Sequence, residues 1–275
     1  MNTLQPLVVG ITAAFVSEAG VPIYNRIAEY LQKQLEQKVD FVTGFSYSTV
    51  NEMLGKGIIS VAFVCGLPYV MSRETQPPQS QIIAAPVLEA PRYQKKPQYF
   101  SDISVHINSP IKSFMDLRDK VFVYNEEISN SGYNMPRYHM LRLGLTHGFF
   151  KKVLRSGSHE ESIRMVAEGL ADASAVDSMV LDYDKAKNPE FASRIKVIES
   201  LGPAPIPPVV VSSHLSTSQL ELIRKSFIEM HTNPEGQAIL NEALLNRFVT
   251  VIDQDYQSIQ IIRDEALKAG FSKIR

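Results

Sequence analysis

The sequence predicts an α/β fold made of two lobes, and three observations support this prediction. Short apolar strands alternate with helical patterns, an order that is typical of largely parallel sheets. The order begins again near residue 101, and two helix–glycine–strand stretches match each other at a fixed offset. The expected strands are 7–13, 39–43 and 58–64 in the first lobe and 99–107, 121–125, 173–176 and 195–198 in the second.

Helices are expected between these strands, where apolar residues recur three and four positions apart. The clearest runs from Ser158 to Leu170 and starts with Ser158 and Glu161 in the spacing of a capping box. Another run, 135–143, ends at Gly144. The first helix has its apolar face at Ile23, Ile27, Leu31 and Leu35.

The proline-rich segment 201–208 marks the boundary between the lobes. Its prolines are incompatible with a helix or a central strand, so it is interpreted as a connector. We therefore expect residues 1–98 and 206–275 to form a discontinuous first lobe and residues 99–205 to form the second. Two later helices, around 220–230 and 256–269, are expected to pack on the first lobe.

An internal correspondence supports two lobes of similar build. Residues 53–57 lead into the strand 58–64 as residues 165–169 lead into 170–176, at an offset of 165 − 53 = 112. Chance similarity of short apolar patterns is the alternative explanation. The same offset pairs residues at helix starts or strand ends, where open α/β sheets bind ligands: Ser46 with Ser158, Tyr47 with His159, and Cys65 with Asp177.

Composition excludes several classes of protein. The chain has 275 residues, of which 44% are hydrophobic and 21% are charged, and its net charge is −1. It therefore lacks the excess of basic residues that binding to nucleic acid or to an acidic membrane requires. No apolar run reaches the ~18–20 residues of a membrane-spanning helix. The one cysteine, Cys65, excludes an intramolecular disulfide and a cysteine-cluster zinc site, and His139 and His147 have no metal-ligand spacing. We expect no metal and no cofactor.

The most informative motif is Ser129-Asn130-Ser131-Gly132-Tyr133, which lies between the strand 121–125 and the helix 135–143. The first turn of a helix has N–H groups without partners and partial positive charge, so it can hold a small oxyanion. The hydroxyls of Ser129 and Ser131 would add donors, and Gly132 allows a close approach of the backbone. The alternative is an ordinary helix cap followed by a turn glycine.

These motifs resemble the substrate-binding components of phosphate, phosphite and phosphonate ABC importers. The resemblance rests on segments 108–111, 116–120, 129–133, 157–160 and 169–173 and extends over most of the chain. It implies a type II periplasmic-binding-protein fold with two Rossmann-like lobes, a ligand cleft between them, hinge closure and no catalysis. Its implied partners are a small anionic ligand and an ABC permease or a membrane sensor.

The resemblance also implies a periplasmic location, and we expect a monomer. The apolar stretch 7–16 has no basic segment before it and is interpreted as a strand rather than a signal peptide.

The resemblance nominates Ser129, Asn130, Ser131 and His159 as donors to the ligand, with Tyr47 facing them from the other lobe. Closure would bring Tyr69 and Cys65 over the anion. Members that bind aminophosphonates have carboxylates where this chain has Met179 and Pro207, so an aminophosphonate is a poor candidate ligand. Asp177 could accept a proton from a partly protonated oxyanion or simply cap its helix, and both roles remain open.

Several alternatives remain open. Cys65 could be an inert buried thiol, or it could bind a thiophilic oxyanion such as arsenite in the ligand-sensing subunit of a two-component system. An enzyme of the same fold, acting on a small phosphorylated or pyrimidine-like substrate, is a further alternative. A triad of Ser131, His159 and Asp177 is disfavoured because the chain has no Gly-x-Ser-x-Gly motif.

The tyrosines that could line a cleft or belong to the core are Tyr47, Tyr69, Tyr93, Tyr99 and Tyr133.

Overall fold

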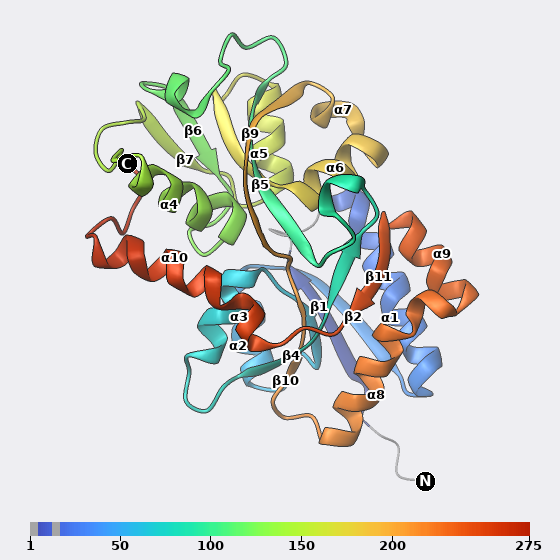
Figure 1. Ribbon diagram of the computed structural model, residues 1–275. Helices are drawn as coiled ribbons and strands as arrows, with labels where there is room; N and C mark the ends of the chain where they lie inside the picture. The colour runs from blue at the N-terminus through green and yellow to red at the C-terminus, as the bar shows by residue number, and fades with distance from the viewer. Residues whose placement is uncertain (1–4, 13–16) are drawn as a thin grey trace. The chain divides into compact units, whose positions relative to one another are not determined.

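The computed structural model describes residues 5–12 and 17–275, and the chain divides into two compact units (Figure 1). Unit 1 is formed by residues 5–12, Gly20–Gln98 and Pro205–Tyr256. Unit 2 is formed by residues 17–19, Tyr99–Ala204 and Gln257–Arg275. Within the described residues from 17 onward, the chain passes between the units at 19/20, 98/99, 204/205 and 256/257.

Unit 1 contains a six-stranded sheet in the order β11-β4-β10-β3-β1-β2. β1 is parallel to β2 and to β3, whereas β10 is antiparallel to β3. The strands are β1 (Leu7–Thr12), β2 (Val39–Phe45), β3 (Val61–Phe63), β4 (Ser80–Leu88), β10 (Val209–Ser212) and β11 (Leu245–Val249). The helices are α1 (Val21–Leu35), α2 (Tyr47–Gly55), α3 (Gly66–Arg73), α8 (Thr217–Ile228) and α9 (Pro234–Glu242).

Unit 2 contains a five-stranded sheet in the order β7-β6-β8-β5-β9, with hydrophobic clusters packed against it. β6 is parallel to β7 and β8, whereas β5 is antiparallel to β8. The strands are β5 (Gln98–His106), β6 (Val121–Tyr124), β7 (Lys152–Arg155), β8 (Ala173–Asp177) and β9 (Ile195–Pro205). The helices are α4 (Met135–Arg142), α5 (His159–Ala167), α6 (Ser178–Lys187), α7 (Pro189–Ala192) and α10 (Gln257–Lys268).

The two units repeat one topology. The series β1-α1-β2-α2-β3-α3 in unit 1 corresponds to β6-α4-β7-α5-β8-α6 in unit 2, and an antiparallel strand, β10 or β5, adjoins the third strand of each series. Ser46 and Ser158 are the N-caps of α2 and α5, and Cys65 and Asp177 are the N-caps of α3 and α6. The structure therefore confirms the 112-residue correspondence.

The observed limits of several elements differ from the expected ones, and the strands expected at 7–13, 58–64 and 195–198 are examples. β1 ends at Thr12, and Ala13 lies outside the described residues. The expected strand 58–64 is only three residues long, and the strand expected at 195–198 continues as β9 to Pro205. β9 is an edge strand, the position in a sheet where a proline's missing N–H is tolerated, so half of the expected connector is strand.

The C-terminal helix packs on unit 2, so the expectation that it would pack on the first lobe was wrong. α10 ends in a Schellman motif in which Phe271 N–H donates to Ala266 O and Gly270 N–H to Leu267 O. Phe271 and Ile274 then enter the core of unit 2. The guanidinium of Arg137 on α4 donates to Ser272 O at 2.8 Å. In residues 5–12 and 17–275, no helix is long and apolar enough to cross a membrane.

Candidate anion-binding site

The Ser129–Tyr133 motif forms a single turn of π-helix, η4 (Asn130–Asn134), that leads directly into α4. Ser129 is its N-cap, and Asn134 N–H donates to Ser129 O at 3.0 Å in the wide i to i−5 pattern. Such single π turns are frequent at functional sites. The turn lies beyond the carboxyl end of β6, the edge of the sheet at which open α/β folds bind ligands.

The hydrogen bonds of this turn decide which groups can serve a ligand. Ser129 Oγ accepts from Gly132 N–H at 3.0 Å and so caps the turn, and Ser129 N–H donates to Glu126 O. Within the described part of the chain, no acceptor is found for the main-chain N–H of Ser131 or of Tyr133. With the helix dipole behind them, these two amides are placed to donate to a small anion, and the pair is called the anion seat below.

Gly132 is required by the close approach of a buried side chain. A Cβ built at this position would lie 1.9 Å from Asn125 Oδ1 and 3.2 Å from Ser129 Oγ. Asn125 follows β6 directly and is fully buried, so it has little room to move away. The absence of a side chain at residue 132 therefore allows the π turn to pack on Asn125.

His159 contributes a neutral imidazole beside the seat. It is the first residue of α5 and is 2% exposed, and its Nδ1 accepts from Asp177 N–H at 3.4 Å. That hydrogen bond places the ring proton on Nε2, which lies 3.4 Å from Ser131 Oγ. Burial lowers the pKa of His159 to about 3, so the imidazole acts as an uncharged donor at neutral pH.

The buried neutral state of His159 predicts a pH effect on stability. The folded pKa, about 3, lies below the ordinary value of 6.5, so between these values the unfolded chain takes up a proton that the folded chain does not. The wild type should therefore lose stability relative to His159→Gln as the pH falls below 6.5, by at most ~1.4 kcal/mol per pH unit. Urea unfolding of both proteins without ligand measures this difference, and parallel curves would contradict it.

Asp177 lies at the carboxyl end of β8 and caps α6. Its Oδ1 accepts from Met179 N–H at 2.8 Å, so the capping role that the sequence left open is confirmed. The side chain is 1% exposed, and burial raises the pKa of Asp177 to about 8. The main-chain N–H groups of Met179 and Val180 act against this rise, and the carboxylates of Asp102 and Asp182 add to it.

Two neighbouring residues were missed by the sequence analysis. Ser101 Oγ donates to Ser131 O at 2.6 Å, and Asn125 lies between Gly132 and His159. Ser101 is on β5, which pairs with β8 from a distant part of the sequence. No residue pattern near Ser101 indicates this pairing. Asn125 did have a signal, because it is a polar residue immediately after an apolar strand. Tyr99, a suspected cleft residue, is fully buried and accepts from Asn130 Nδ2 at 3.0 Å.

Two predicted tyrosines have structural partners that limit their roles. The hydroxyl of Tyr69, on α3, donates to Asp253, which is also bound by Arg73, so its proton is not available to a ligand. Burial and the Asp253 carboxylate raise the pKa of Tyr69. The ring of Tyr133 lies in the core of unit 2 and its Oη accepts from Ile274 N–H at 3.0 Å, so only its main-chain N–H can serve an anion.

The remaining predicted residues, Tyr47 and Cys65, belong to unit 1. Tyr47 is the first residue of α2 and Cys65 is the N-cap of α3, and each is 1% exposed. They occupy the positions in unit 1 that His159 and Asp177 occupy in unit 2. In the described residues, no group of three or more His, Cys, Asp or Glu side chains could hold a metal ion.

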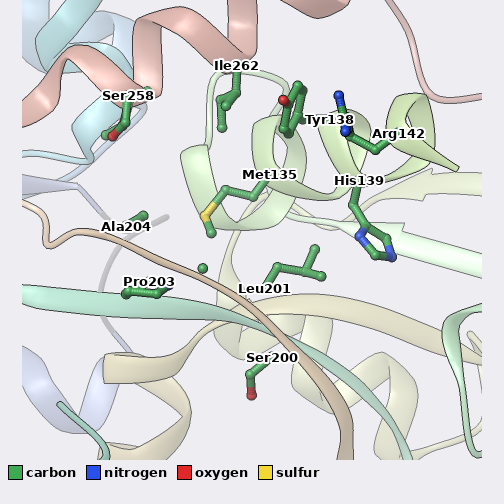
Figure 2. Close-up of a pocket in the computed structure, with 12 residues that line it drawn as sticks. Met135, Tyr138, His139, Arg142, Ser200, Leu201, Pro203, Ala204, Ser258 and Ile262 are labelled. Carbon is green, nitrogen blue, oxygen red and sulfur yellow. The ribbon is translucent and has the colours of Figure 1, made fainter.

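Unit 2 also contains a pocket of about 420 Å³ that shares no residue with the predicted anion-binding set (Figure 2). α4, β9 and α10 form its walls, which are mainly apolar. Two of these walls adjoin the points where the chain passes between the units, since Ala204 precedes Pro205 and Ser258 follows soon after Tyr256. The lining residues are Met135, Tyr138, His139, Arg142, Ser200, Leu201, Gly202, Pro203, Ala204, Ser258, Ile259 and Ile262.

Comparisons with known proteins agree with the fold. A binding-protein component of an ABC phosphonate transporter from Pseudomonas aeruginosa superposes with a TM-score of 0.84 at 20% identity, covering 96% of this chain and 87% of that one. PhnD1 from Prochlorococcus marinus (MIT 9301), solved in complex with methylphosphonate, gives 0.84 at 22% identity, covering 96% and 99%. The predicted type II periplasmic-binding-protein fold is thereby confirmed.

Sequence similarity identifies the family. A probable ABC transporter phosphite-binding protein, PhnD1 of Prochlorococcus marinus (strain MIT 9301), is 27% identical over 178 residues. That match covers 63% of this chain and 59% of the relative, which is less than two thirds of its length. Residues 9–256 match the family model described as ABC transporter, phosphonate, periplasmic substrate-binding protein. The chain therefore belongs to this family of non-catalytic, periplasmic phosphonate-binding proteins of ABC transporters.

Proposed function

We propose that this protein captures a small phosphonate-type oxyanion in the periplasm and delivers it unchanged to an ABC importer. The observation that carries the proposal is the pair of main-chain N–H groups at Ser131 and Tyr133, which have no acceptor in the described residues, beside the buried neutral imidazole of His159. Family membership over residues 9–256 and the relatives' ligands, phosphite and methylphosphonate, support the same ligand class.

The donors are sufficient for tight binding. The two amides, the Ser131 hydroxyl and His159 Nε2–H offer four hydrogen bonds to an anion, each worth about 1.5–3 kcal/mol before ordering costs. Micromolar affinity needs only about 8 kcal/mol in total. None of these donors carries a full charge, so the helix dipole and the hydrogen bonds together must balance the anion. The contacts predicted from Tyr47 and Cys65 of unit 1 remain part of the proposal.

Calorimetric titration with methylphosphonate, phosphite, phosphate and sulfate tests the proposal. We expect methylphosphonate or phosphite to bind most tightly and to be recovered chemically unchanged. If none of the four binds, the proposed function is wrong. A ligand present at 100 times its Kd should also stabilise the folded protein by about 2.7 kcal/mol, which a thermal shift would detect.

Ser131→Ala is the clearest test of the anion seat. The change removes a hydroxyl that lies 3.4 Å from His159 Nε2, and it leaves the cap made by Ser129 Oγ in place. We expect the affinity for methylphosphonate to fall at least tenfold, in line with ~1.5–3 kcal/mol for a hydrogen bond to a charged group. Ser104→Ala removes another fully buried hydroxyl of unit 2 and serves as the matched control. Equal affinities of the two variants would contradict the assignment.

A further inference from the structure

One oxygen of the buried Asp177 carboxyl group lacks a hydrogen-bond partner in the described residues. Oδ1 caps α6 through Met179 N–H, whereas Oδ2 has no hydrogen-bond partner in the described residues. The side chain is 1% exposed, so solvent does not satisfy this oxygen. Buried polar atoms are nearly always hydrogen-bonded, so an unpartnered one calls for an explanation such as a functional role or a bound ligand.

The pairing of the strands places this carboxyl group next to the anion seat. Asp177 lies directly opposite Ser101 in the antiparallel pair of β8 and β5, so the two side chains are on the same face of the sheet. On that face, Ser101 Oγ donates to Ser131 O at 2.6 Å. The main chain of Asp177 also donates to His159 Nδ1. Asp177 is therefore bonded to His159 and lies opposite the serine that donates to Ser131, and His159 and Ser131 are the residues proposed to bind the ligand.

The charges around Asp177 favour its neutral form. From β5 and from its own helix, the charged groups that act on it are the carboxylates of Asp102 and Asp182. From α5 it meets the uncharged His159. A bound oxyanion would add another negative charge beside it. Desolvation and like charges both raise a carboxyl pKa, which for Asp177 lies at about 8 before any ligand arrives.

Building on the proposed function, we infer that Asp177 is held as the neutral acid and donates a hydrogen bond from Oδ2 to the bound oxyanion. A carboxylate at this place would repel an anion, whereas the protonated acid adds a fifth donor without adding charge. The ligand class is therefore a fully or partly ionised oxyanion that does not have to supply a proton of its own. A buried carboxylic acid kept neutral by its surroundings is an established way to hydrogen-bond an anionic oxygen.

The test compares the wild type with Asp177→Asn from pH 5.5 to 9.5, using methylphosphonate in calorimetric titrations. Asparagine is a good N-cap and its amide donates at every pH. The ionisation of the ligand is common to both titrations and cancels in the ratio of the two dissociation constants. We expect a constant ratio up to about pH 8. Above it, the wild type should weaken relative to Asp177→Asn by up to tenfold per pH unit, because the acid must be protonated to bind.

Two results would overturn the inference. A flat ratio over the whole range would show that the Asp177 proton takes no part in binding. Loss of methylphosphonate affinity in Asp177→Asn at pH 6, with a gain for methanesulfonate, would show that a carboxylate accepts a proton from the ligand instead. Absence of any methylphosphonate binding by the wild type would refute the proposed function itself, which is a distinguishable outcome.

A ligand-free measurement checks the protonation state independently. The folded pKa of Asp177, about 8, lies above its ordinary value of 3.8, so the stability gained from holding the proton is present at low pH and is lost as the pH rises between these values. The melting temperature of the wild type should therefore fall relative to Asp177→Asn from pH 4 to pH 8. The infrared band of a protonated carboxyl should be present in the wild type at pH 7 and absent from the variant. Failure of both signals would also overturn the inference.

Discussion

Gly132→Ala is expected to abolish high-affinity anion binding and to destabilise the protein. The new Cβ would lie 1.9 Å from Asn125 Oδ1, far inside van der Waals contact. Asn125 is fully buried and its amide lies 3.2 Å from His159 Nε2, so relief of the clash must displace either that amide or the π turn. Overpacking of this kind costs about 1–3 kcal/mol. We expect at least a hundredfold loss of methylphosphonate affinity, because the two amides of the seat move with the turn.

Gly144→Ala is the matched control for this prediction. Gly144 follows α4 at a φ of +71° and has open space where a Cβ would be, so alanine there adds backbone strain without a clash. The control should lower the melting temperature slightly and leave methylphosphonate affinity within twofold of the wild type. Calorimetry and thermal unfolding of both variants make the comparison. A Gly132→Ala protein that binds as tightly as Gly144→Ala would show that the turn does not form the seat.

The prediction of an anion seat rests on local signals in the sequence. Ser129 and Gly132 follow an apolar strand and precede a helix, and the physics of a helix start needs no distant partner. The correspondence of Tyr47 with His159 and of Cys65 with Asp177 was also visible, since both units repeat one order of strands and helices. Both predictions came from patterns of ten to twenty residues, namely the helix start and the helix–glycine–strand stretches.

The parts that failed depend on distant pairings. Nothing near Tyr69 in the sequence indicates that its hydroxyl bonds Asp253, which is 184 residues away. The pairing of Ser101 with Asp177, 76 residues apart (177 − 101 = 76), is equally invisible, although it places Asp177 opposite the serine that donates to Ser131 O. The C-terminal helix was assigned to the first lobe because an amphipathic pattern shows that a helix packs, but not against which sheet.

Phe271→Ala is expected to cost about 3–5 kcal/mol of stability, the usual range when a buried phenylalanine is truncated. Phe271 is 2% exposed and belongs to the core cluster of unit 2, where it follows the Schellman end of α10. The loss should extend to the ligand site. The segment that Phe271 anchors continues to Ile274, whose N–H donates to Tyr133 Oη, and includes Ser272, whose carbonyl accepts from Arg137.

Leu267→Ala, on the helix that precedes Phe271, is the control that truncates a large apolar side chain without removing core packing. Leu267 is 48% exposed, so its truncation should change stability by less than about 0.5 kcal/mol. Urea unfolding with and without methylphosphonate measures both variants, and the ligand should recover part of the stability lost in Phe271→Ala, since it binds only the folded protein. If the two variants unfold at the same urea concentration, the C-terminal segment does not anchor unit 2. The Tyr133 turn would then be held by its other contacts, among them the hydrogen bonds of Asn134 and Ser101.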